Sequence, residues 1–163
     1  MRTIASARVA VLAAALLAFL FTGLLVTAPL LQQDGSILGW VVRAFGSTVC
    51  HQDAGRSLTV GGTPLAVCSR CIGLYAGGVL GLLAGGWMSA WRRPAPRALF
   101  FILIAPTLVD AVLPMTGLFG YEGLANLPRM LISLPAGGVC GWVLAIAIGD
   151  MMAGRAAARQ EAE

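Results

Sequence analysis

Residues 71–91 read CIGLYAGGVLGLLAGGWMSAW, a run without a charged side chain that ends at Arg92 and Arg93. A helix of about 20 apolar residues covers the hydrocarbon core of a bilayer. The stretch therefore predicts a membrane-spanning helix, and this assignment decides the fold class of the chain.

Three more apolar runs surround this stretch. Residues 9–31 carry no charge, residues 98–118 are interrupted only by Asp110, and a last run follows Arg129. Each run is long enough to cross a bilayer once. We therefore expect one membrane domain over residues 1–163, an all-α membrane protein folded as a four-transmembrane-helix bundle. The predicted spans cover residues 9–31, 70–91, 98–118 and 130–151.

The first run has an alternative interpretation as a secretory signal peptide, because Arg2 and Arg8 precede it. The apolar region of a signal peptide usually has about 7–15 residues, which is shorter than residues 9–31. Pro29 directly follows Ala28 and would hinder cleavage there. We therefore expect this run to be retained as a helix.

The composition also indicates an integral membrane protein. Hydrophobic residues make up 58% of the chain and charged residues 11%. So few charges cannot cover the surface of a soluble globule, and disordered chains are poor in apolar residues. The net charge of +4 comes from arginines that stand singly or in short groups beside apolar runs, with no lysine. This pattern is typical of membrane anchors, so the lipid bilayer is the expected partner and nucleic acid is not.

The arginines predict the orientation of the spans. Residues 92–97 carry three arginines, and each terminal segment carries two. The positive-inside rule then places this connection and both termini in the cytoplasm. We expect a multi-pass protein of the cell (inner) membrane of a prokaryote, with residues 32–69 as an external or periplasmic loop.

Small residues recur at every fourth position in two of the predicted spans. They are Gly73, Gly77, Gly81 and Gly85 in the second span, and Ser133, Gly137, Gly141, Ala145 and Gly149 in the fourth. Helices in lipid gain much of their packing where small residues let the backbones approach closely. We expect these two stripes to touch each other. A homo-oligomer formed through a glycine-rich helix face is the alternative.

The predicted external loop contains a short apolar segment and a turn signal. Residues 37–45 are too few to cross a bilayer and predict an interfacial helix. Gly61 and Gly62 separate two short segments and favour a tight β-hairpin turn. Continuing the register from that turn gives the pairs Val60–Thr63, Gly55–Cys68 and Gln52–Cys71. The hairpin would therefore bring Cys50 and His51 to the Cys68–Cys71 end of the loop.

A metal site is the first hypothesis for these residues. The predicted ligands are Cys50, His51, Cys68 and Cys71. Three thiolates and one imidazole match the donors of a tetrahedral zinc site, and Arg70 with the helix amino-terminus favours the thiolate form. Because adjacent side chains in an extended chain point to opposite faces, His51 needs a local kink to be a ligand. Without one, His51 is an acid or base beside the metal, and Asp110 or a water completes the coordination.

Two other readings of the cysteines stay open. The Cys68–Cys71 pair could cycle between dithiol and disulfide with Cys50 as its exchange partner, as in four-helix membrane proteins that pass electrons from thiols to quinone. A structural disulfide from Cys50 could instead staple the hairpin in an oxidising compartment. Cys140 lies in the middle of the fourth span, where we expect a small packing residue outside the site.

Polar residues within the later spans predict a second cluster. Asp110 lies 13 residues after Arg97, in the outer half of the third span, where an ionisable group is costly and marks function by default. Arg129 is its expected counter-charge, and Asn126 would extend the cluster beneath the cysteine loop. The pair is either a structural ion pair that fixes the third and fourth spans or part of a proton relay, a substrate contact or a further metal site. Further expected members of this polar cavity are Arg56, Arg70 and Tyr75.

The cysteine elements carry a family resemblance. Cys50-His51-Gln52 with Arg56-Ser57, followed by Cys68-Ser69-Arg70-Cys71-Ile72-Gly73-Leu74-Tyr75, resembles a family of small, uncharacterised prokaryotic integral membrane proteins defined as a domain of unknown function. The resemblance covers about residues 45–145 and departs from the expected pattern at Ala111, where we expect glycine. It implies the membrane topology and a shared site, and it implies no activity.

These features predict an integral membrane protein with an outward-facing Cys/His site for a transition metal, zinc being favoured, above a small polar cavity. The alternatives are a membrane thiol-disulfide oxidoreductase that uses quinone and a structural or assembly protein with a stapled loop. Candidate catalytic residues are His51, Asp110 and Arg129. Whether the protein is an enzyme, and which small molecule it acts on, stays open at this point.

Overall fold

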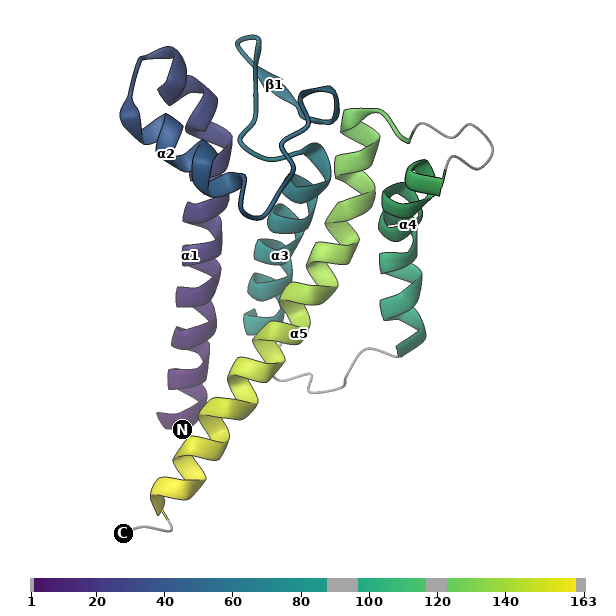
Figure 1. The fold of residues 1–163 in the computed structure, drawn as a ribbon. Coiled ribbons are helices and arrows are strands. Elements are labelled where there is room, and N and C mark those ends of the chain that lie inside the picture. Colours follow the sequence, from purple (N-terminus) through teal and green to yellow (C-terminus); the bar gives the residue numbers. More distant parts are fainter. Residues whose placement is uncertain (1, 88–96, 117–122, 161–163) are drawn as a thin grey trace.

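The computed structural model describes residues 2–87, 97–116 and 123–160, and these residues are mostly helical (Figure 1). Five α-helices, one 3-10 turn and one short strand pair follow one another. They are α1 (Arg2–Gln33), α2 (Ile37–Gly46), η1 (Ala54–Arg56), β1 (Thr59–Val60), β2 (Thr63–Pro64), α3 (Ser69–Trp87), α4 (Arg97–Thr116) and α5 (Asn126–Gln160).

Three stretches within the described helices are long and apolar enough to cross a membrane. They are Ala5–Gln33, Ala98–Thr116 and Asn126–Gly154, and they include most of the first, third and fourth predicted spans. The fourth long helix, α3, has 19 residues but is rich in glycine and carries Arg70, which lowers its mean hydropathy. Crossing by α3 therefore stays a prediction. The predicted ends at residues 88–91 and 117–118 lie outside the described residues.

Helices α3 and α5 pack through their glycine stripes, as the sequence predicts. A Cβ added at Gly77 or Gly81 would overlap the carbonyl oxygen of Leu134 or Gly138, respectively, and a Cβ at Gly141 would overlap that of Gly78. Only glycine permits such close backbone contact. Because the two stripes face each other within one chain, a homo-oligomer through either stripe would require this contact to open.

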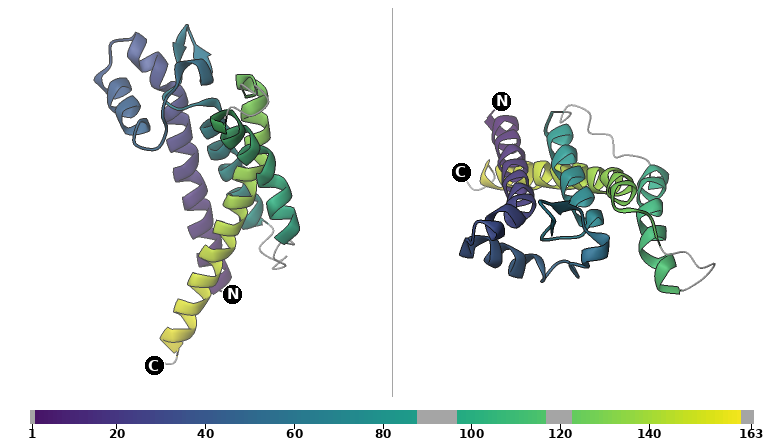
Figure 2. Two further views of the ribbon diagram at one scale, coloured as in Figure 1. Left: turned by 45° about the vertical axis from the view of Figure 1, so that its right-hand side comes forward. Right: turned by 90° about the horizontal axis from the view of Figure 1, so that it is seen from above.

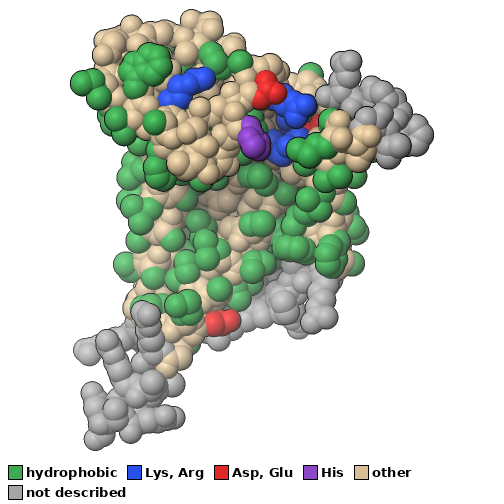
Figure 3. All heavy atoms as spheres, in the orientation of Figure 1, with side chains coloured by type: hydrophobic (Ala, Val, Ile, Leu, Met, Phe, Trp, Pro, Cys, Tyr) green, Lys and Arg blue, Asp and Glu red, His purple; other side chains and the backbone are tan. Residues whose placement is uncertain are grey.

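The other long helices lie around this pair. Helix α1 contacts both α3 and α5, and α4 contacts α5 (Figure 2). Apolar side chains cover the sides of the helical part, whereas arginine, aspartate and histidine side chains gather at the end that carries the loop (Figure 3). Among the described residues, the end that carries the loop is therefore polar, and the candidate site lies there.

The loop between α1 and α3 folds onto the ends of these helices. The predicted short helix is present as α2, which exposes Ile37, Trp40 and Phe45, and its place at the membrane interface stays a prediction. The predicted hairpin is also present, with Val60 opposite Thr63. Its turn residues Gly61 and Gly62 have φ values of +58° and +80°, which suit glycine.

The predicted continuation of the hairpin register is wrong. Strand pairing ends at Thr59–Pro64, with one more hydrogen bond from the Leu65 N–H to the Leu58 carbonyl oxygen. The 3-10 turn η1 then bends the chain away, held by a hydrogen bond from the Gly55 N–H to the Asp53 carboxylate. The expected pairs Gly55–Cys68 and Gln52–Cys71 are replaced by a direct contact of Cys50 with Cys68.

A compact core fixes the loop to the helices. Leu25 of α1, Val42 of α2 and Ile72 of α3 pack with the segment after the hairpin, of which Ala66 and Val67 are fully buried. Cys50 belongs to the same buried cluster. Burying these apolar side chains stabilises the loop by the hydrophobic effect and holds the cysteines at the end of α3.

Candidate metal centre and polar cluster

Three cysteine thiols converge where the loop meets α3. Cys50 follows α2, Cys68 directly precedes α3, and Cys71 lies in the first turn of α3. Their Sγ atoms all lie within 4.8 Å of one another, and Cys68 Sγ and Cys71 Sγ are 3.5 Å apart. Cys50 is buried, and the other two thiols are half-buried.

Backbone contacts hold the Cys50 thiol in place. The Cys68 N–H donates to Cys50 Sγ at 3.2 Å, and the Gln52 N–H lies 3.5 Å from the same sulfur. The Cys50 N–H in turn donates to the Gly46 carbonyl oxygen at 3.0 Å. These contacts fix the position of the Cys50 sulfur next to the start of α3.

Gln52 ties the first cysteine element to the rest of the loop. Its backbone has a φ of +53°, and its side-chain Nε2 donates to the carbonyl oxygens of Arg43 and Ala66, both at 2.6 Å. These bonds join the end of α2 to the segment before Cys68. Sequence reasoning noted Gln52 as part of a motif but missed this positioning role.

His51 lies apart from the three thiols. The group of ligand atoms within reach of one ion, among the described residues, consists of Cys50, Cys68 and Cys71, and His51 is exposed. The structure therefore brings together three of the four predicted ligands. A role for His51 as an acid or base stays a prediction.

The geometry of the sulfurs fits a tetrahedral metal. Zinc binds thiolates at about 2.3 Å, which puts two sulfurs of one tetrahedral site about 3.8 Å apart. The Cys68–Cys71 separation of 3.5 Å is close to this value, and the separations from Cys50 Sγ, all within 4.8 Å, need only small side-chain adjustments. Three protein thiolates leave one coordination position for another donor.

The Cys68 thiol is acidified by its neighbours. The hydrogen bond with the Cys71 side chain lowers the pKa of Cys68 to about 5, with further lowering by hydrogen bonds from the Cys71 and Arg70 backbone and by Cys50, and partial burial opposes the effect. The lowered pKa favours the thiolate form of Cys68 at neutral pH. Such a group is both a metal ligand and a nucleophile.

A buried ion cluster lies beside the thiols. Asp110 of α4 is 1% exposed, and its Oδ2 accepts from Arg129 Nε at 3.0 Å, so the predicted pair is present. Arg70 Nη2 donates to the same Oδ2 at 2.6 Å, and the Leu124 N–H donates to Oδ1 at 2.9 Å. The sequence analysis placed Arg70 both beside the thiols and in the polar cavity, but it did not predict this bond. Because Arg70 lies between Cys68 and Cys71 in sequence, it links the thiols to the cluster.

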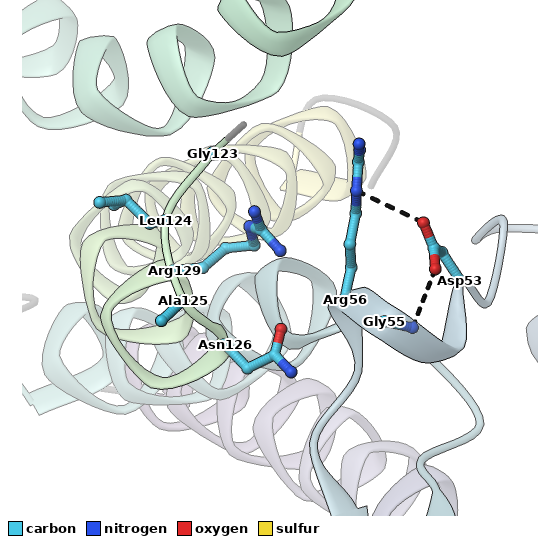
Figure 4. Close-up of a pocket in the computed structure, with 8 residues that line it drawn as sticks. All are labelled: Asp53, Gly55, Arg56, Gly123, Leu124, Ala125, Asn126 and Arg129. Carbon is cyan, nitrogen blue, oxygen red and sulfur yellow. Dashed lines mark hydrogen bonds and ion pairs between the residues drawn. The ribbon is translucent and has the colours of Figure 1, made fainter. Parts of the chain in front are cut away.

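A polar pocket of about 440 Å³ opens next to the ion cluster (Figure 4). Its wall includes three of the expected cavity residues, Arg56, Asn126 and Arg129. Asp53 and Gly123, which sequence reasoning missed, also line it, whereas Asp110 and Arg70 are not among the wall residues. Asn126 Nδ2 donates to the Ser57 carbonyl oxygen at 3.0 Å and joins α5 to the hairpin loop. The missed residues have no signal of their own in the sequence, because they meet only through the fold.

Tyr75 lies outside this polar pocket, contrary to the prediction. Its ring packs edge-on against Phe21 of α1, with the ring centroids 5.6 Å apart. Together with Leu74 and Cys140 it lines an apolar groove of about 360 Å³ between α1, α3 and α5. Tyr75 lies one helical turn after Cys71, on the side of α3 that faces α1 and not α4. Its ring therefore cannot reach the polar pocket beside α4. Cys140 is exposed on α5 and lies outside the thiol group.

The fold and the site define a class: a helical membrane protein whose polar end carries converging thiols. Residues 50–146 match the family described as "Predicted membrane protein (DUF2085)", and the chain belongs to this family. The matched range begins at Cys50 and includes all three thiols, Asp110 and Arg129. The resemblance expected from the cysteine elements is thus confirmed.

Two archaeal relatives are similar to this chain, and each is named only as an uncharacterized protein. The relative from Methanothermobacter thermautotrophicus is 33% identical over 89 residues, which are 55% of this chain and 78% of the relative. The relative from Methanocaldococcus jannaschii is 33% identical over 75 residues, which are 44% of this chain and 47% of the relative. The chain thus spans about half the length of the second relative. No solved structure matches the chain.

Proposed function

We propose that this integral membrane protein binds one transition-metal ion, zinc being favoured, through Cys50, Cys68 and Cys71 on the outer side of the membrane. The observation that carries the proposal is the approach of three Sγ atoms to within 4.8 Å of one another. A single disulfide uses two sulfurs and would leave the third unexplained. Zinc accepts thiolate and imidazole donors in a tetrahedral site and has no redox chemistry of its own.

The fourth ligand decides whether the site is structural or reactive. Closure by His51 would give four protein ligands, as in structural zinc sites, whereas a bound water would leave a position open for chemistry. His51 is exposed and outside the thiol group. This placement favours an open position, with His51 as an acid or base beside the metal and Asp110 as the buried carboxylate beyond Arg70.

The direct test is a metal and thiol count on the full chain purified in mild detergent. We expect about one equivalent of metal and three thiols that a chelator releases for alkylation. Cys68→Ser should abolish metal binding, whereas the matched control Cys140→Ser should retain it. A sample without metal in which all of Cys50, Cys68 and Cys71 are freely alkylated would contradict the proposal.

Thiol-disulfide exchange is the second candidate function, favoured by the 3.5 Å separation of Cys68 Sγ and Cys71 Sγ and by the acidified Cys68 thiol. A substrate dithiol would reduce the Cys68–Cys71 disulfide by exchange and become a disulfide itself. A quinone would then reoxidise the pair and be reduced to the quinol by two electrons and two protons. The quinone would bind in the apolar groove at Tyr75. Metal-free protein with a dithiothreitol-sensitive Cys68–Cys71 disulfide would favour this function, and an inert Cys50-linked disulfide would favour a structural staple.

A further inference from the structure

Among the described residues, the ion cluster beneath the polar pocket has two guanidinium groups and one carboxylate. Arg70 and Arg129 both bond to the single carboxylate of Asp110, and the side chains of Arg129 and Asp110 are 4% and 1% exposed. The acidic side chain in the described pocket wall, Asp53, already pairs with Arg56 at 3.4 Å. A buried guanidinium without a full counter-charge is costly, so an anion in the pocket would stabilise this arrangement.

Two guanidinium groups reach the pocket from different elements. Figure 4 shows Arg56 from η1 and Arg129 from α5 approaching the same space. Arg129 is held by its Nε–Asp110 bond, so its terminal nitrogens are fixed in position. Gly123 makes room for them, because a Cβ there would lie 2.5 Å from Arg129 Nη2. Planar guanidinium groups bind phosphate and carboxylate oxygens with paired hydrogen bonds.

The pocket also contains an acceptor that lacks a donor. Asn126 Oδ1 is buried and has no hydrogen-bond partner among the described residues, while its Nδ2 is bonded to the Ser57 carbonyl oxygen. A buried acceptor is costly unless it receives a hydrogen bond. A ligand that carries a hydroxyl group next to its anionic group would supply one.

We propose that this pocket binds a hydroxylated phosphate. In this arrangement Arg56 and Arg129 hold the phosphate oxygens, and Asn126 Oδ1 accepts a hydrogen bond from the neighbouring hydroxyl. The chemistry is shared by the head group of phosphatidylglycerol and by soluble glycerol 3-phosphate. The inference rests on the polar cavity of the proposed function and needs no metal at the thiols.

The test is binding to the full chain in detergent, measured for four ligands in parallel: phosphatidylglycerol, phosphatidylcholine, glycerol 3-phosphate and inorganic phosphate. We expect phosphatidylglycerol or glycerol 3-phosphate to bind more tightly than phosphatidylcholine and inorganic phosphate. Binding of the lipid alone identifies a head-group site, and binding of glycerol 3-phosphate as well identifies a soluble ligand. Equal binding of all four, or no binding, would overturn the proposal.

Two variants assign the binding to this pocket. Arg56 is half-exposed, and Arg56→Gln should weaken binding at least about tenfold by removing charge-assisted hydrogen bonds. The control Arg8→Gln removes the same charge from an exposed position on α1 and should leave binding unchanged. Asn126→Ala should remove the preference for glycerol 3-phosphate over inorganic phosphate. Unchanged binding in Arg56→Gln would refute the site.

Metal content measured on the same samples separates this inference from the proposed function. The arginine variants should keep the metal content of the wild-type chain, because neither residue belongs to the thiol group. A chain that binds the hydroxylated phosphate but no metal would refute the metal site alone. A chain with metal but without phosphate binding would refute the pocket alone.

Discussion

At the scale of single residues, a neighbour of the thiols, Gln52, holds the cysteine loop in place. Gln52 joins α2 to the segment before α3 through two hydrogen bonds of 2.6 Å, and its N–H lies beside Cys50 Sγ. Neighbouring His51 is exposed and makes none of these contacts. Within this motif, His51, the candidate catalytic residue, is therefore less constrained by contacts than Gln52 beside it.

This difference gives a prediction for metal affinity. Gln52→Ala should weaken zinc binding by about 10- to 100-fold, as loss of groups that orient metal ligands does. His51→Ala should leave the metal content nearly unchanged if the metal keeps a water as its fourth ligand. Competition with a chromogenic chelator measures both. The opposite order, with His51→Ala losing the metal and Gln52→Ala retaining it, would show that His51 closes the site.

The acidified thiol predicts a pH profile. A thiol with a pKa lowered from 9.0 to about 5 is deprotonated above that pH, so the alkylation rate of Cys68 in metal-free protein should rise between about pH 4 and 6 and then level off. Peptide mapping after iodoacetamide treatment follows each cysteine separately, with Cys140 as the internal control. A rate that keeps rising towards pH 9 would contradict the acidification.

The buried ion cluster predicts that a single substitution at Asp110 greatly lowers folding stability. Asp110→Asn leaves the guanidinium groups of Arg70 and Arg129 without their carboxylate, and breaking a buried pair in this way costs about 3–5 kcal/mol of folding stability. Asp150→Asn makes the same change at an exposed position of α5 and should be nearly neutral. Thermal unfolding in detergent compares the two. Equal melting temperatures would show that the cluster does not stabilise the fold.

At the scale of helices, the contact between α3 and α5 follows from backbone geometry. The small-residue stripes predicted that the two helices touch, and the structure adds where the contact ends. Gly85 meets the Ala145 side chain, whereas a Cβ at Gly149 would have no neighbour within 4 Å. Among the described residues, the contact therefore ends before Gly149, since α5 continues past the described end of α3 at Trp87.

This geometry gives a matched pair of variants. Gly81→Ala places a methyl group on the Gly138 carbonyl oxygen, so the helices must move apart at a cost of about 1–3 kcal/mol or more. Gly149→Ala adds the same methyl group in open space and should be neutral or slightly stabilising, since alanine favours helix. Melting temperatures in detergent measure the difference. Equal effects would mean that the close contact is absent.

At the scale of the whole molecule, the unequal arginine distribution predicts the direction of insertion. The hairpin should face outward and the connection between α3 and α4 inward. In a cysteine-free background, Val60→Cys should react with a membrane-impermeant thiol reagent in intact cells, and Pro94→Cys should react only after lysis. Protection at position 60 with labelling at position 94 would reverse the topology.

The sequence by itself determined the features that depend on local order along the chain. Apolar runs predicted the membrane class and the long helices, the four-residue spacing predicted the α3–α5 contact, and Gly61-Gly62 predicted the hairpin turn. Each of these follows from helix periodicity, turn chemistry or hydropathy within about 20 residues.

Only the tertiary structure decided which polar groups meet. Arg70 bonds to Asp110, 40 positions away, while Tyr75 on the same helix turns to α1. The thiols converge without His51, which is exposed, and the pocket forms where η1 and α5 approach. These contacts depend on the rotation of the helices and on how far the loop folds back. Close glycine packing and burial of the loop core set both, and they involve residues far apart in the chain.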